Sequence, residues 1–410
     1  MKIKILKGTN QIGGCITEIT TDNAKIIIDF GEDLPDVSLK NNNNVPLIEG
    51  LTHGTKKYDA VFITHNHKDH IGLISNILPE IPVYVEKASK EIFNVVNDFM
   101  GIKEACNTIN MLAEIPIIIE DIKITPYIVD HSAYNSLMLL IESDGKKVLH
   151  TGDFRNNGYK GKYLKDTLKK IGKVDIVITE GTSFDRINKK NKTEEELSKE
   201  AYEVMKKYNQ IFVLQSGTNI DRITTMYKAS KKARKLFVED IFIANLTKLT
   251  KSSIPNPLTF EDVYTYIPLK RYINKDSEFY YKYIEPFNKK NAITKMFNND
   301  YVLNIRTSMI NDLKKFKEKE LITNACLIYS MWDGYRKKEE FKKFLNEVEK
   351  LGINIVYLHT SGHASINTIK EVVNILKPNI VIPIHTKNKM KAKEIFKNSV
   401  ILNDNEGVEI

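Results

Sequence analysis

The sequence predicts an α/β protein with two domains. Apolar runs of about four to seven residues recur along the chain, and such runs bounded by turn residues are typical of buried strands. Stretches with helical character lie between them: the acidic residues that follow Thr193, for example, indicate the start of a helix. The chain has 410 residues, more than one hydrophobic core usually serves, and 42% of them are hydrophobic. We therefore expect two packed α/β domains.

The composition gives no sign of a membrane or secreted protein. No apolar run reaches the roughly 20 residues that are needed to cross a bilayer. The N-terminal stretch 1–6 is too short to be a signal peptide. The three cysteines, Cys15, Cys106 and Cys326, are scattered and odd in number, which indicates a reducing compartment without a disulfide framework. We expect a cytoplasmic protein with no membrane partner.

The chain is basic, with a formal net charge of +9 and a pI near 9.0. A basic excess is expected of proteins that bind polyanions, because each lysine or arginine near a phosphate releases counterions. It is also common in lysine-rich proteins that have no such partner. The charge alone therefore favours nucleic acid only modestly.

The first part of the chain is rich in predicted strands. Residues 2–5 and 15–19 alternate between apolar and polar side chains, and residues 24–30 form an apolar strand that contains Asp29 near its end. A short buried strand follows at residues 60–63. An amphipathic helix is then expected from about Ile71 to Leu78.

A histidine-rich loop connects that strand to that helix. Three of the nine histidines in the chain fall within six positions, His65, His67 and His70, with Asp69 between the last two. Two imidazoles at positions i and i+2 cannot share a helix face, but they converge where a strand ends in a loop. Imidazole and carboxylate are ligands that suit zinc or a similar metal, so we expect one or two ions here. The alternative is a polar surface loop that happens to be rich in histidine.

Further strands place acids and histidines at their ends. Five strands are expected at residues 115–119, 122–124, 137–142, 147–150 and 174–179. The third and fourth form a hairpin around Asp144-Gly145. His131 follows the second strand, Asp153 follows the fourth, and Glu180 follows the fifth.

The composition changes after residue 187. A polar linker at 188–192 leads into a second α/β region whose clearest strands are 211–214 and 326–329 and whose last helix spans 337–351. The chain then returns to short buried strands at 353–358 and 380–383, each followed by histidine.

One stretch of the second region mixes aromatic and basic side chains, from Tyr264 to Phe287. Aromatic residues beside cations can stack bases and follow a nucleic-acid backbone. Ordinary packing is the favoured interpretation, because aromatic residues dominate protein cores.

The acids and histidines at strand ends make one set: Asp29, the loop residues 65–70, His131, Asp153, Glu180, His363 and His385. Any one of them taken alone is more often structural than functional. Strand ends along one edge of a sheet converge, however, so the whole set is expected to line one cleft.

These residues resemble the ordered motifs of a known family. Asp29, the loop His65-x-His67-x-Asp69-His70, His131 and Asp153 resemble the four motifs of the metallo-β-lactamase superfamily. The flavodiiron branch carries glutamate where this chain has His67, so the resemblance implies hydrolytic zinc chemistry.

Three further motifs resemble the β-CASP branch of nucleic-acid-processing nucleases. They are Glu180, His363 within Ser361-Gly362-His363-Ala364-Ser365, and His385 within Pro383-Ile384-His385. Stretches 219–222 and 330–335 also resemble parts of the β-CASP domain. The implied fold is an αββα metallo-β-lactamase sandwich with an inserted α/β β-CASP domain. The expected boundaries are 1–190 and 353–410 for the sandwich and 191–352 for the insertion.

The resemblance also implies the ligands of two Zn²⁺ ions per chain, with Mn²⁺ as a substitute in vitro. His65, His67 and His131 would hold one ion; Asp69, His70 and His385 would hold the other; Asp153 would bridge them. Asp29 would orient a ligand, and His363 with Glu180 would assist the departing alkoxide. The assigned catalytic residues are thus Asp69, His363, Glu180 and Asp29. Substrate contacts are assigned to Ser361, Gly362, His363, Ala364 and Ser330.

The implied function is a ribonuclease J-like enzyme that hydrolyses phosphodiester bonds of single-stranded RNA, as an exonuclease, an endonuclease or both. The last motif is histidine in RNA-processing members and valine in Artemis-type DNA nucleases, so His385 favours RNA. The resemblance also allows a homodimer. Three alternatives stay open: a DNA nuclease of the same family, a small-molecule metallo-hydrolase, and a non-catalytic RNA-binding subunit.

Overall fold

The computed structural model describes residues 1–34, 45–102, 106–186, 191–268 and 274–410. The chain folds into two compact units. The first comprises Met1–Asn191 and Gly362–Ile410, and the second comprises Lys192–Ser361. Among the described residues, no helix combines the length and the apolar composition that a membrane crossing requires.

The first unit is built on two facing sheets. A seven-stranded sheet has the order β19-β1-β2-β3-β4-β5-β6, and a six-stranded sheet has the order β18-β11-β10-β9-β8-β7. The strands of the first sheet are β1 (Lys2–Lys7), β2 (Ile16–Thr20), β3 (Lys25–Ile28), β4 (Ala60–Phe62), β5 (Val83–Val85), β6 (Thr108–Asn110) and β19 (Glu406–Glu409). Those of the second sheet are β7 (Ile117–Ile119), β8 (Ile122–Ile128), β9 (Leu137–Ser143), β10 (Lys146–His150), β11 (Ile176–Glu180) and β18 (Ile380–Ile384). Inward side chains of both sheets, such as Ile26 and Leu139, form one apolar core.

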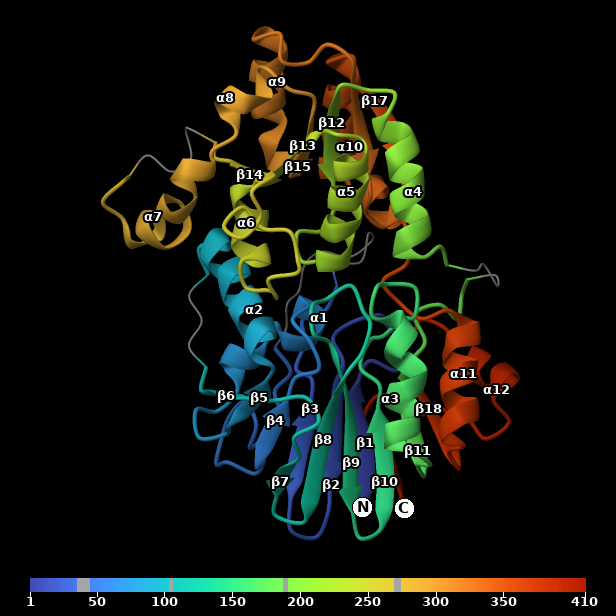
Figure 1. The fold of residues 1–410 in the computed structure, drawn as a ribbon. Helices are drawn as coiled ribbons and strands as arrows, with labels where there is room; N and C mark the ends of the chain where they lie inside the picture. Colours follow the sequence, from blue (N-terminus) through green and yellow to red (C-terminus); the bar gives the residue numbers. More distant parts are fainter. Residues whose placement is uncertain (35–44, 103–105, 187–190, 269–273) are drawn as a thin grey trace. The chain divides into compact units, whose positions relative to one another are not determined.

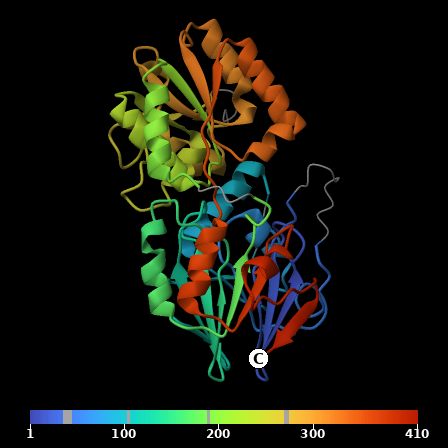
Figure 2. The same cartoon turned by 90° about the vertical axis from the view of Figure 1, so that its right-hand side faces the viewer.

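Helices cover the outer faces of these sheets. They are α1 (Lys68–Ile71), α2 (Lys87–Met100), α3 (Leu164–Ile171), α11 (Ile366–Leu376) and α12 (Lys391–Ile395), with short 3₁₀ turns η1 (Ile74–Asn76) and η2 (Gly161–Tyr163). Phe93 of α2 packs on the first sheet, and Leu168 of α3 with Ile369 of α11 packs on the second. Helices α3 and α11 lie side by side (Figure 1, Figure 2). The unit is therefore an αββα sandwich, and the predicted α/β class is confirmed.

The long helix that was expected from Ile71 to Leu78 does not form. Helix α1 ends at Ile71, and only the turn η1 follows. The reason is that backbone groups in this stretch bond to distant segments: Leu73 N donates to Phe30 O at 3.0 Å and Leu78 N to Leu51 O at 2.8 Å. These tertiary hydrogen bonds replace the helical ones and tie the histidine loop to its neighbours.

The second unit is a parallel sheet with helices on both faces. Its order is β14-β13-β15-β12-β16-β17. The strands are β12 (Gln210–Leu214), β13 (Leu236–Asp240), β14 (Val263–Tyr266), β15 (Tyr301–Ile305), β16 (Ala325–Tyr329) and β17 (Asn354–Tyr357). The helices are α4 (Glu194–Met205), α5 (Ile220–Lys232), α6 (Ile241–Thr247), α7 (Glu278–Tyr283), α8 (Ile293–Met296), α9 (Ile310–Glu318) and α10 (Glu339–Lys350), with 3₁₀ turns η3 (Glu285–Lys290), η4 (Thr307–Met309) and η5 (Asp333–Lys337). Helices α8, α9 and α10 pack on one face in a single core.

The stretch 353–358 was expected to open the return to the first domain, and this is wrong. Strand β17 pairs in parallel with β16 and forms an edge of the second sheet. A short apolar run carries no mark of the sheet to which it belongs, because pairing partners are set by tertiary contacts.

Candidate metal centre

The carboxyl-terminal ends of several strands in the first unit converge on one cluster of acids and histidines. Asp29 follows β3, the histidine loop follows β4, Asp153 follows β10, and His385 follows β18. The structure brings together all ten side chains that the sequence assigned to metal binding or catalysis in this unit: Asp29, His65, His67, Asp69, His70, His131, Asp153, Glu180, His363 and His385.

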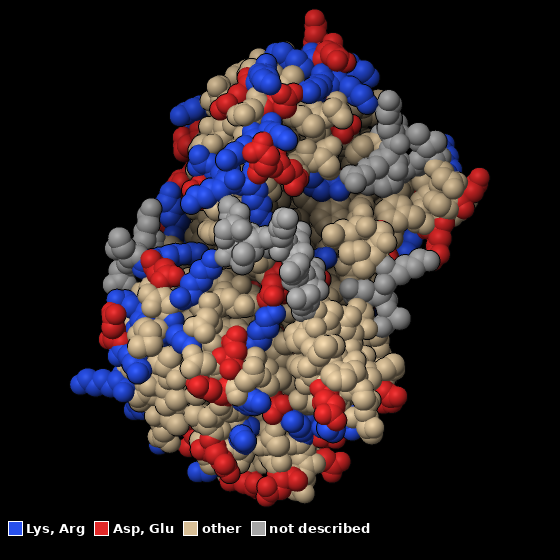
Figure 3. All heavy atoms as spheres, turned by 180° about the vertical axis from the view of Figure 1, so that it is seen from behind, with Lys and Arg blue, Asp and Glu red and all other residues tan. Residues whose placement is uncertain are grey.

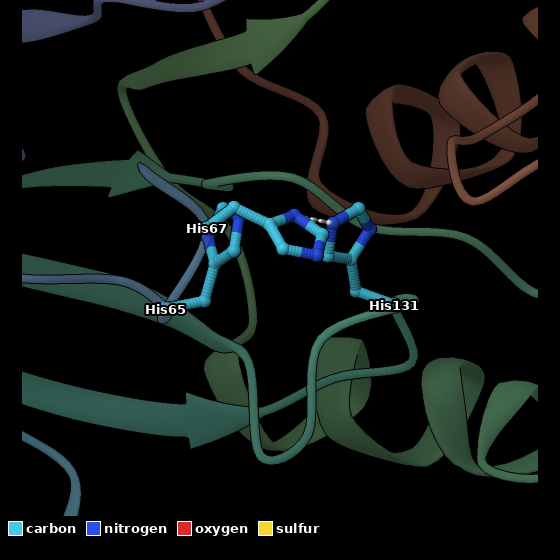
Figure 4. Close-up of side chains that lie close together, drawn as sticks. All are labelled: His65, His67 and His131. Carbon is cyan, nitrogen blue, oxygen red and sulfur yellow. Dashed lines mark hydrogen bonds between the residues drawn. The ribbon is translucent and has the colours of Figure 1, made fainter. Parts of the chain in front are cut away.

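Three imidazoles form the first ligand group. One ring nitrogen from each of His65, His67 and His131 lies within 4.8 Å of the others. Nε2 of His131 is 3.2 Å from Nδ1 of His67, and Figure 4 shows the rings turned toward one another.

Asp69, His70 and His385 form the second ligand group, with one atom from each within the same 4.8 Å limit. His385 Nε2 lies 3.2 Å from Asp69 Oδ2. Both side chains are buried, although they are 316 positions apart in the chain.

Asp153 lies between the two groups. Its Oδ2 atom is 3.3 Å from His70 Nε2 and 3.5 Å from His385 Nε2 in the second group. The same atom is 3.9 Å from Nε2 of both His65 and His131 in the first group. A carboxylate in this position can reach both groups at once.

The donor atoms fit a metal. Nε2 of His65, Nε2 of His70 and Oδ1 of Asp153 are buried and have no hydrogen-bond partner among the described residues. Burial lowers the pKa of His65 and His131 and lowers that of His67 to about 4, so these rings are neutral. A neutral imidazole is the form that donates its lone pair to a metal. Nitrogen and carboxylate donors together suit zinc or a similar ion.

Hydrogen bonds fix the orientation of the ligand rings. Asp29 Oδ2 accepts from His70 Nδ1 at 2.7 Å and from Thr64 Oγ1 at 2.9 Å, and its Oδ1 accepts from Thr64 N at 2.8 Å. Thr182 Oγ1 lies 2.8 Å from His385 Nδ1. Both contacts leave Nε2 of the histidine directed at the cluster. The sequence reasoning missed Thr182; its place two residues after Glu180 was the only signal.

A glycine lets the histidine loop approach β3 closely. A Cβ on Gly31 would stand 1.8 Å from the carbonyl oxygen of Asp69, which excludes any side chain at this position. The same carbonyl accepts a hydrogen bond from Gly14 N at 3.1 Å. Backbone contacts thus hold Asp69 in place.

Glu180 and His363 form a pair beside the ligand groups. Glu180 Oε2 lies 3.0 Å from His363 Nδ1, while its Oε1 accepts from Phe154 N at 3.0 Å and from Ala364 N at 3.4 Å. Burial lowers the pKa of His363, but Glu180 and Asp153 outweigh this effect and raise it to about 8. The ring is therefore mostly protonated at neutral pH.

Glu180 and His363 also lie close to the candidate ligands. One atom each of Asp153, Glu180, His363 and His385 meets the same proximity limit, so Glu180 and His363 lie within reach of an ion that Asp153 would hold. A Cβ on Gly362 would stand 2.6 Å from Ser132 Oγ, so any side chain at this position would force Ser132 to shift.

Ser361 and Ser330 belong to the second unit. Ser330 is buried; its Oγ accepts from Arg222 Nη1 at 2.5 Å and donates to Leu358 O at 2.6 Å. These bonds favour a structural role over the expected substrate contact. The aromatic stretch 264–287 is packed only in part: Tyr266, Tyr283 and Phe287 are buried, whereas Tyr281 is 56% exposed. Lys270, Arg271 and Tyr272 lie outside the described residues.

Comparisons with known proteins show which domains and which proteins this chain resembles. Residues 25–208 match the Beta-lactamase superfamily domain, and residues 348–396 match the Zn-dependent metallo-hydrolase RNA specificity domain. Similar curated proteins include Ribonuclease J of Mycoplasma genitalium (24% identical, covering 95% of this chain and 68% of that protein) and Ribonuclease J of Helicobacter pylori strain B128 (23%, 100% and 60%). Ribonuclease J2 of Bacillus subtilis is 20% identical and is covered over 70% of its length. The chain thus spans 60–70% of the length of these relatives.

A solved structure shares the fold. A protein of unknown function from Enterococcus faecalis V583 superposes with a TM-score of 0.78 at 20% identity, over 99% of each chain. The sandwich, the clustered histidines and acids, and the two matching domain models agree. The chain therefore carries a metallo-β-lactamase domain, matched over residues 25–208, together with a metallo-hydrolase RNA specificity domain, matched over residues 348–396.

Proposed function

We propose that the protein is a zinc-dependent ribonuclease that hydrolyses RNA phosphodiester bonds at a centre of two metal ions. The observation that carries this proposal is the position of Asp153 Oδ2, within 3.3–3.9 Å of donor nitrogens from both ligand groups. The RNA specificity domain and the similarity to proteins named Ribonuclease J support RNA as the substrate.

The geometry supports the following ligand roles. His65, His67 and His131 would hold one ion; Asp69, His70 and His385 would hold the other; Asp153 would contact both. When bound, such ions activate water for attack on phosphorus and neutralise charge on the phosphate. Asp29 would keep His70 oriented through the 2.7 Å contact with Nδ1.

His363 would act on the leaving group. Hydrolysis of a phosphodiester expels an alkoxide, which needs a proton. The protonated His363 ring, held by Glu180 at 3.0 Å, is a suitable donor and also a positive charge near the expelled oxygen. Glu180 is itself fixed by two backbone N–H groups, so it positions the ring rigidly.

The alternatives receive less support. A small-molecule hydrolase has no need of a second unit, and a non-catalytic subunit has no need of a complete ligand set. A DNA nuclease of the same family is disfavoured by His385. Lysine and arginine side chains, interspersed with acids, lie on the face of the second unit that Figure 3 shows in its upper half, and such basic groups suit a polyanionic substrate. We further expect single-stranded RNA as substrate, action in the cytoplasm, and a chain able to form a homodimer.

A labelled RNA tests the proposal. The metal-loaded protein is expected to cleave 5′-end-labelled single-stranded RNA, and elemental analysis is expected to find close to two zinc ions per chain. His67→Ala should lose metal and activity together, because it removes a ligand. Released labelled mononucleotides would indicate 5′-to-3′ exonuclease action, and a ladder of fragments would indicate endonuclease action.

Two results would contradict the proposal. One is the absence of RNA cleavage by protein that holds its full complement of metal. The other is a wild-type protein that binds one ion or none when zinc is supplied throughout purification.

A further inference from the structure

Two exposed aromatic side chains lie in the second unit, where strands β16 and β17 end. Trp332 is the single tryptophan of the chain and is 51% exposed. Tyr357, the last residue of β17, is 48% exposed. Large aromatic side chains are mostly buried in proteins, because their burial removes much apolar surface from water. Two that stay exposed at the same end of a sheet indicate a surface that meets a partner.

The chain segments that carry these two residues are fastened to each other. Tyr357 of β17 pairs with Tyr329 of β16, and the centres of their rings lie 5.7 Å apart. The hydroxyl of Tyr329 donates to Trp332 O at 3.3 Å, and Ser330 Oγ donates to Leu358 O at 2.6 Å. Trp332 and Tyr357 therefore belong to one rigid part of the surface.

Local contacts also fix the indole ring of Trp332. A Cβ on Gly334 would overlap the six-membered ring of the indole, so the indole lies where a side chain at 334 would project. The ring of Tyr335 meets the indole edge-on at 5.7 Å and itself stacks on Phe341 at 5.5 Å. A ring that is already held in place loses little conformational freedom when a flat partner stacks on it, which favours binding.

Basic side chains lie beside the same rings. The guanidinium carbon of Arg336 is 4.3 Å from the centre of the Tyr357 ring, and Lys338 Nζ is 5.0 Å from the centre of the Tyr335 ring. Both distances are typical of cation–π contacts. The stretch 336–338 is a run of three cations. The aromatic surface is therefore bordered by positive charge.

Acidic side chains nearby do not cancel this charge. Asp333 accepts from Arg336 Nη1 at 2.7 Å, Glu340 accepts from Thr307 Oγ1 at 2.7 Å, and Glu339 lies 3.8 Å from a lysine of α10. Residues 333–343 hold five basic and three acidic side chains, which leaves a net positive charge beside the rings. A guanidinium also has further N–H groups with which to meet a phosphate oxygen.

This combination suits single-stranded nucleic acid. Every base has a flat π-face that can stack on an aromatic ring, while cations meet the phosphates that join the bases. A protein partner would need the rings but would gain nothing from the net positive charge unless it were acidic. Tyr357 also lies within residues 348–396, the stretch that matches the RNA specificity domain. Rings, cations and domain match together favour RNA.

We propose that Trp332 stacks a base of single-stranded RNA and that Arg336, held against Tyr357, contacts a neighbouring phosphate. Lys338 would add positive charge on the same side. The inference rests on the proposed ribonuclease function and deepens it, because it assigns substrate contacts to the second unit.

The fluorescence of the single tryptophan tests the proposal without any variant. Zinc-loaded full-length protein is titrated with short single-stranded RNA that has phosphorothioate linkages, which resist hydrolysis. Stacking of a base should quench the indole emission, excited at wavelengths that tyrosine does not absorb. The control is a sugar–phosphate chain of the same length without bases. It should leave the emission unchanged, because it can meet the cations but cannot stack.

Affinity for end-labelled RNA gives a second measurement. Trp332→Ala should weaken binding about 5- to 150-fold, the effect of losing one stacked base. Trp332→Phe keeps a flat ring and should stay within about threefold of the wild type. Phe297→Ala is the matched control and should bind like the wild type. Phe297 is also 51% exposed, but it precedes β15 and so lies toward the amino-terminal ends of the parallel strands. All three variants should keep their zinc.

Several results would overturn the proposal. They are RNA binding without quenching, equal quenching by the chain without bases, and unchanged RNA affinity of Trp332→Ala. Equal losses for Trp332→Ala and Phe297→Ala would also overturn it. A change in the oligomeric state of Trp332→Ala at unchanged RNA affinity would assign the surface to a protein partner. Failure of the ribonuclease function is distinguishable, because RNA would then quench the emission of metal-loaded protein but would not be cleaved.

Discussion

Asp153 is the side chain on which the two proposed ligand groups of the candidate metal centre converge. Removing a ligand from this centre and removing a residue beside it have different physical consequences. A lost ligand weakens the ion itself and leaves other buried donors without a partner. A lost proton donor leaves the ions in place and slows only the step in which it acts. Mutations of His385 and His363 therefore separate the two roles.

His363→Ala should keep both metal ions and most of the RNA affinity, and should lower the cleavage rate by ~10²–10⁴-fold. The reason is that His363 Nδ1 bonds to Glu180, and in the proposed mechanism its ring would supply the proton for the leaving oxygen. His385→Ala should instead lose about one ion, because its Nε2 faces Asp69 and Asp153. Elemental analysis and single-turnover cleavage of labelled RNA measure both effects.

The control is His53→Ala, which removes an exposed histidine of the first unit and should change neither quantity. The role assigned to His363 is wrong if its alanine variant loses metal, or if its cleavage rate stays within about threefold of the wild type.

At the scale of single residues, the sequence predicts the candidate ligands better than it predicts the residues that support them. Most of the site's histidines and acids follow strands of the first unit, whereas His363 follows β17, which belongs to the sheet of the second unit. Thr182 carries no such mark, because a hydroxyl two residues after Glu180 resembles any surface threonine until its contact with His385 is known. Ser330 is the opposite case, a residue whose expected role the structure does not favour. Its motif suggested substrate binding, but its hydroxyl accepts a hydrogen bond from Arg222 and donates one to Leu358 O.

At the scale of secondary-structure elements, one buried ion pair in the second unit connects the ends of two helices and two strands. Arg222, near the start of α5, donates from Nε and Nη2 to both carboxylate oxygens of Glu194, at the start of α4, at 2.9 and 3.0 Å. Its Nη1 also reaches Ser330 after β16, and its Nη2 reaches Thr360 O after β17. Both charged side chains are fully buried. The guanidinium thus fixes the ends of two helices and two strands relative to one another.

Arg222→Met should destabilise the second unit by about 3–5 kcal/mol, because it leaves the Glu194 carboxylate buried without its cation. Denaturant unfolding followed by circular dichroism measures the change. The double variant Arg222→Met/Glu194→Gln should recover part of the loss, since the uncompensated charge is gone.

Lys350→Met is the matched control, because Lys350 pairs with Glu347 on the surface at 2.7 Å. Its cost should not exceed about 1 kcal/mol. Equal costs for Lys350→Met and Arg222→Met would show that the buried pair contributes no more than an exposed one.

A helix or strand could be predicted where the local sequence pattern determines its structure. It could not be predicted where tertiary contacts determine it. The helix after Thr193 begins with a capping box between Thr193 and Glu196, a motif that can be recognised from four consecutive residues. The stretch 71–78 has helical spacing, but two of its N–H groups, those of Leu73 and Leu78, bond to the distant carbonyls of Phe30 and Leu51. Strand β17 was placed in the wrong sheet because its pairing with β16 leaves no trace in its own sequence.

For the whole molecule, the order of motifs along the chain predicted the class of fold. Strand β18 returns to pair with β11 and places His385 beside Asp69, which no local pattern could show. Strand β19 then pairs with β1, and Met1 N donates to Ile410 O at 3.1 Å, so both ends lie together (Figure 1). The end of the insertion could not be fixed from sequence, because the second unit continues to Ser361.

The last prediction concerns the substrate of the whole chain. Matched single-stranded RNA and DNA of one sequence, mixed in competition, should show faster cleavage of RNA. The expectation rests on the RNA specificity domain and on His385. Binding should also weaken steeply with salt, because a net charge of +9 favours contacts to phosphate.

The size of the salt effect can be stated in advance. If about four phosphates are neutralised, a slope of about −0.7 per phosphate gives a roughly 50-fold loss of affinity between about 50 and about 200 mM salt. The catalytically weakened His363→Ala protein allows this measurement without cleavage of the RNA. Equal or faster cleavage of DNA would reject the RNA assignment. An affinity that changes less than about threefold over the same salt range would show that phosphate contacts do not dominate binding.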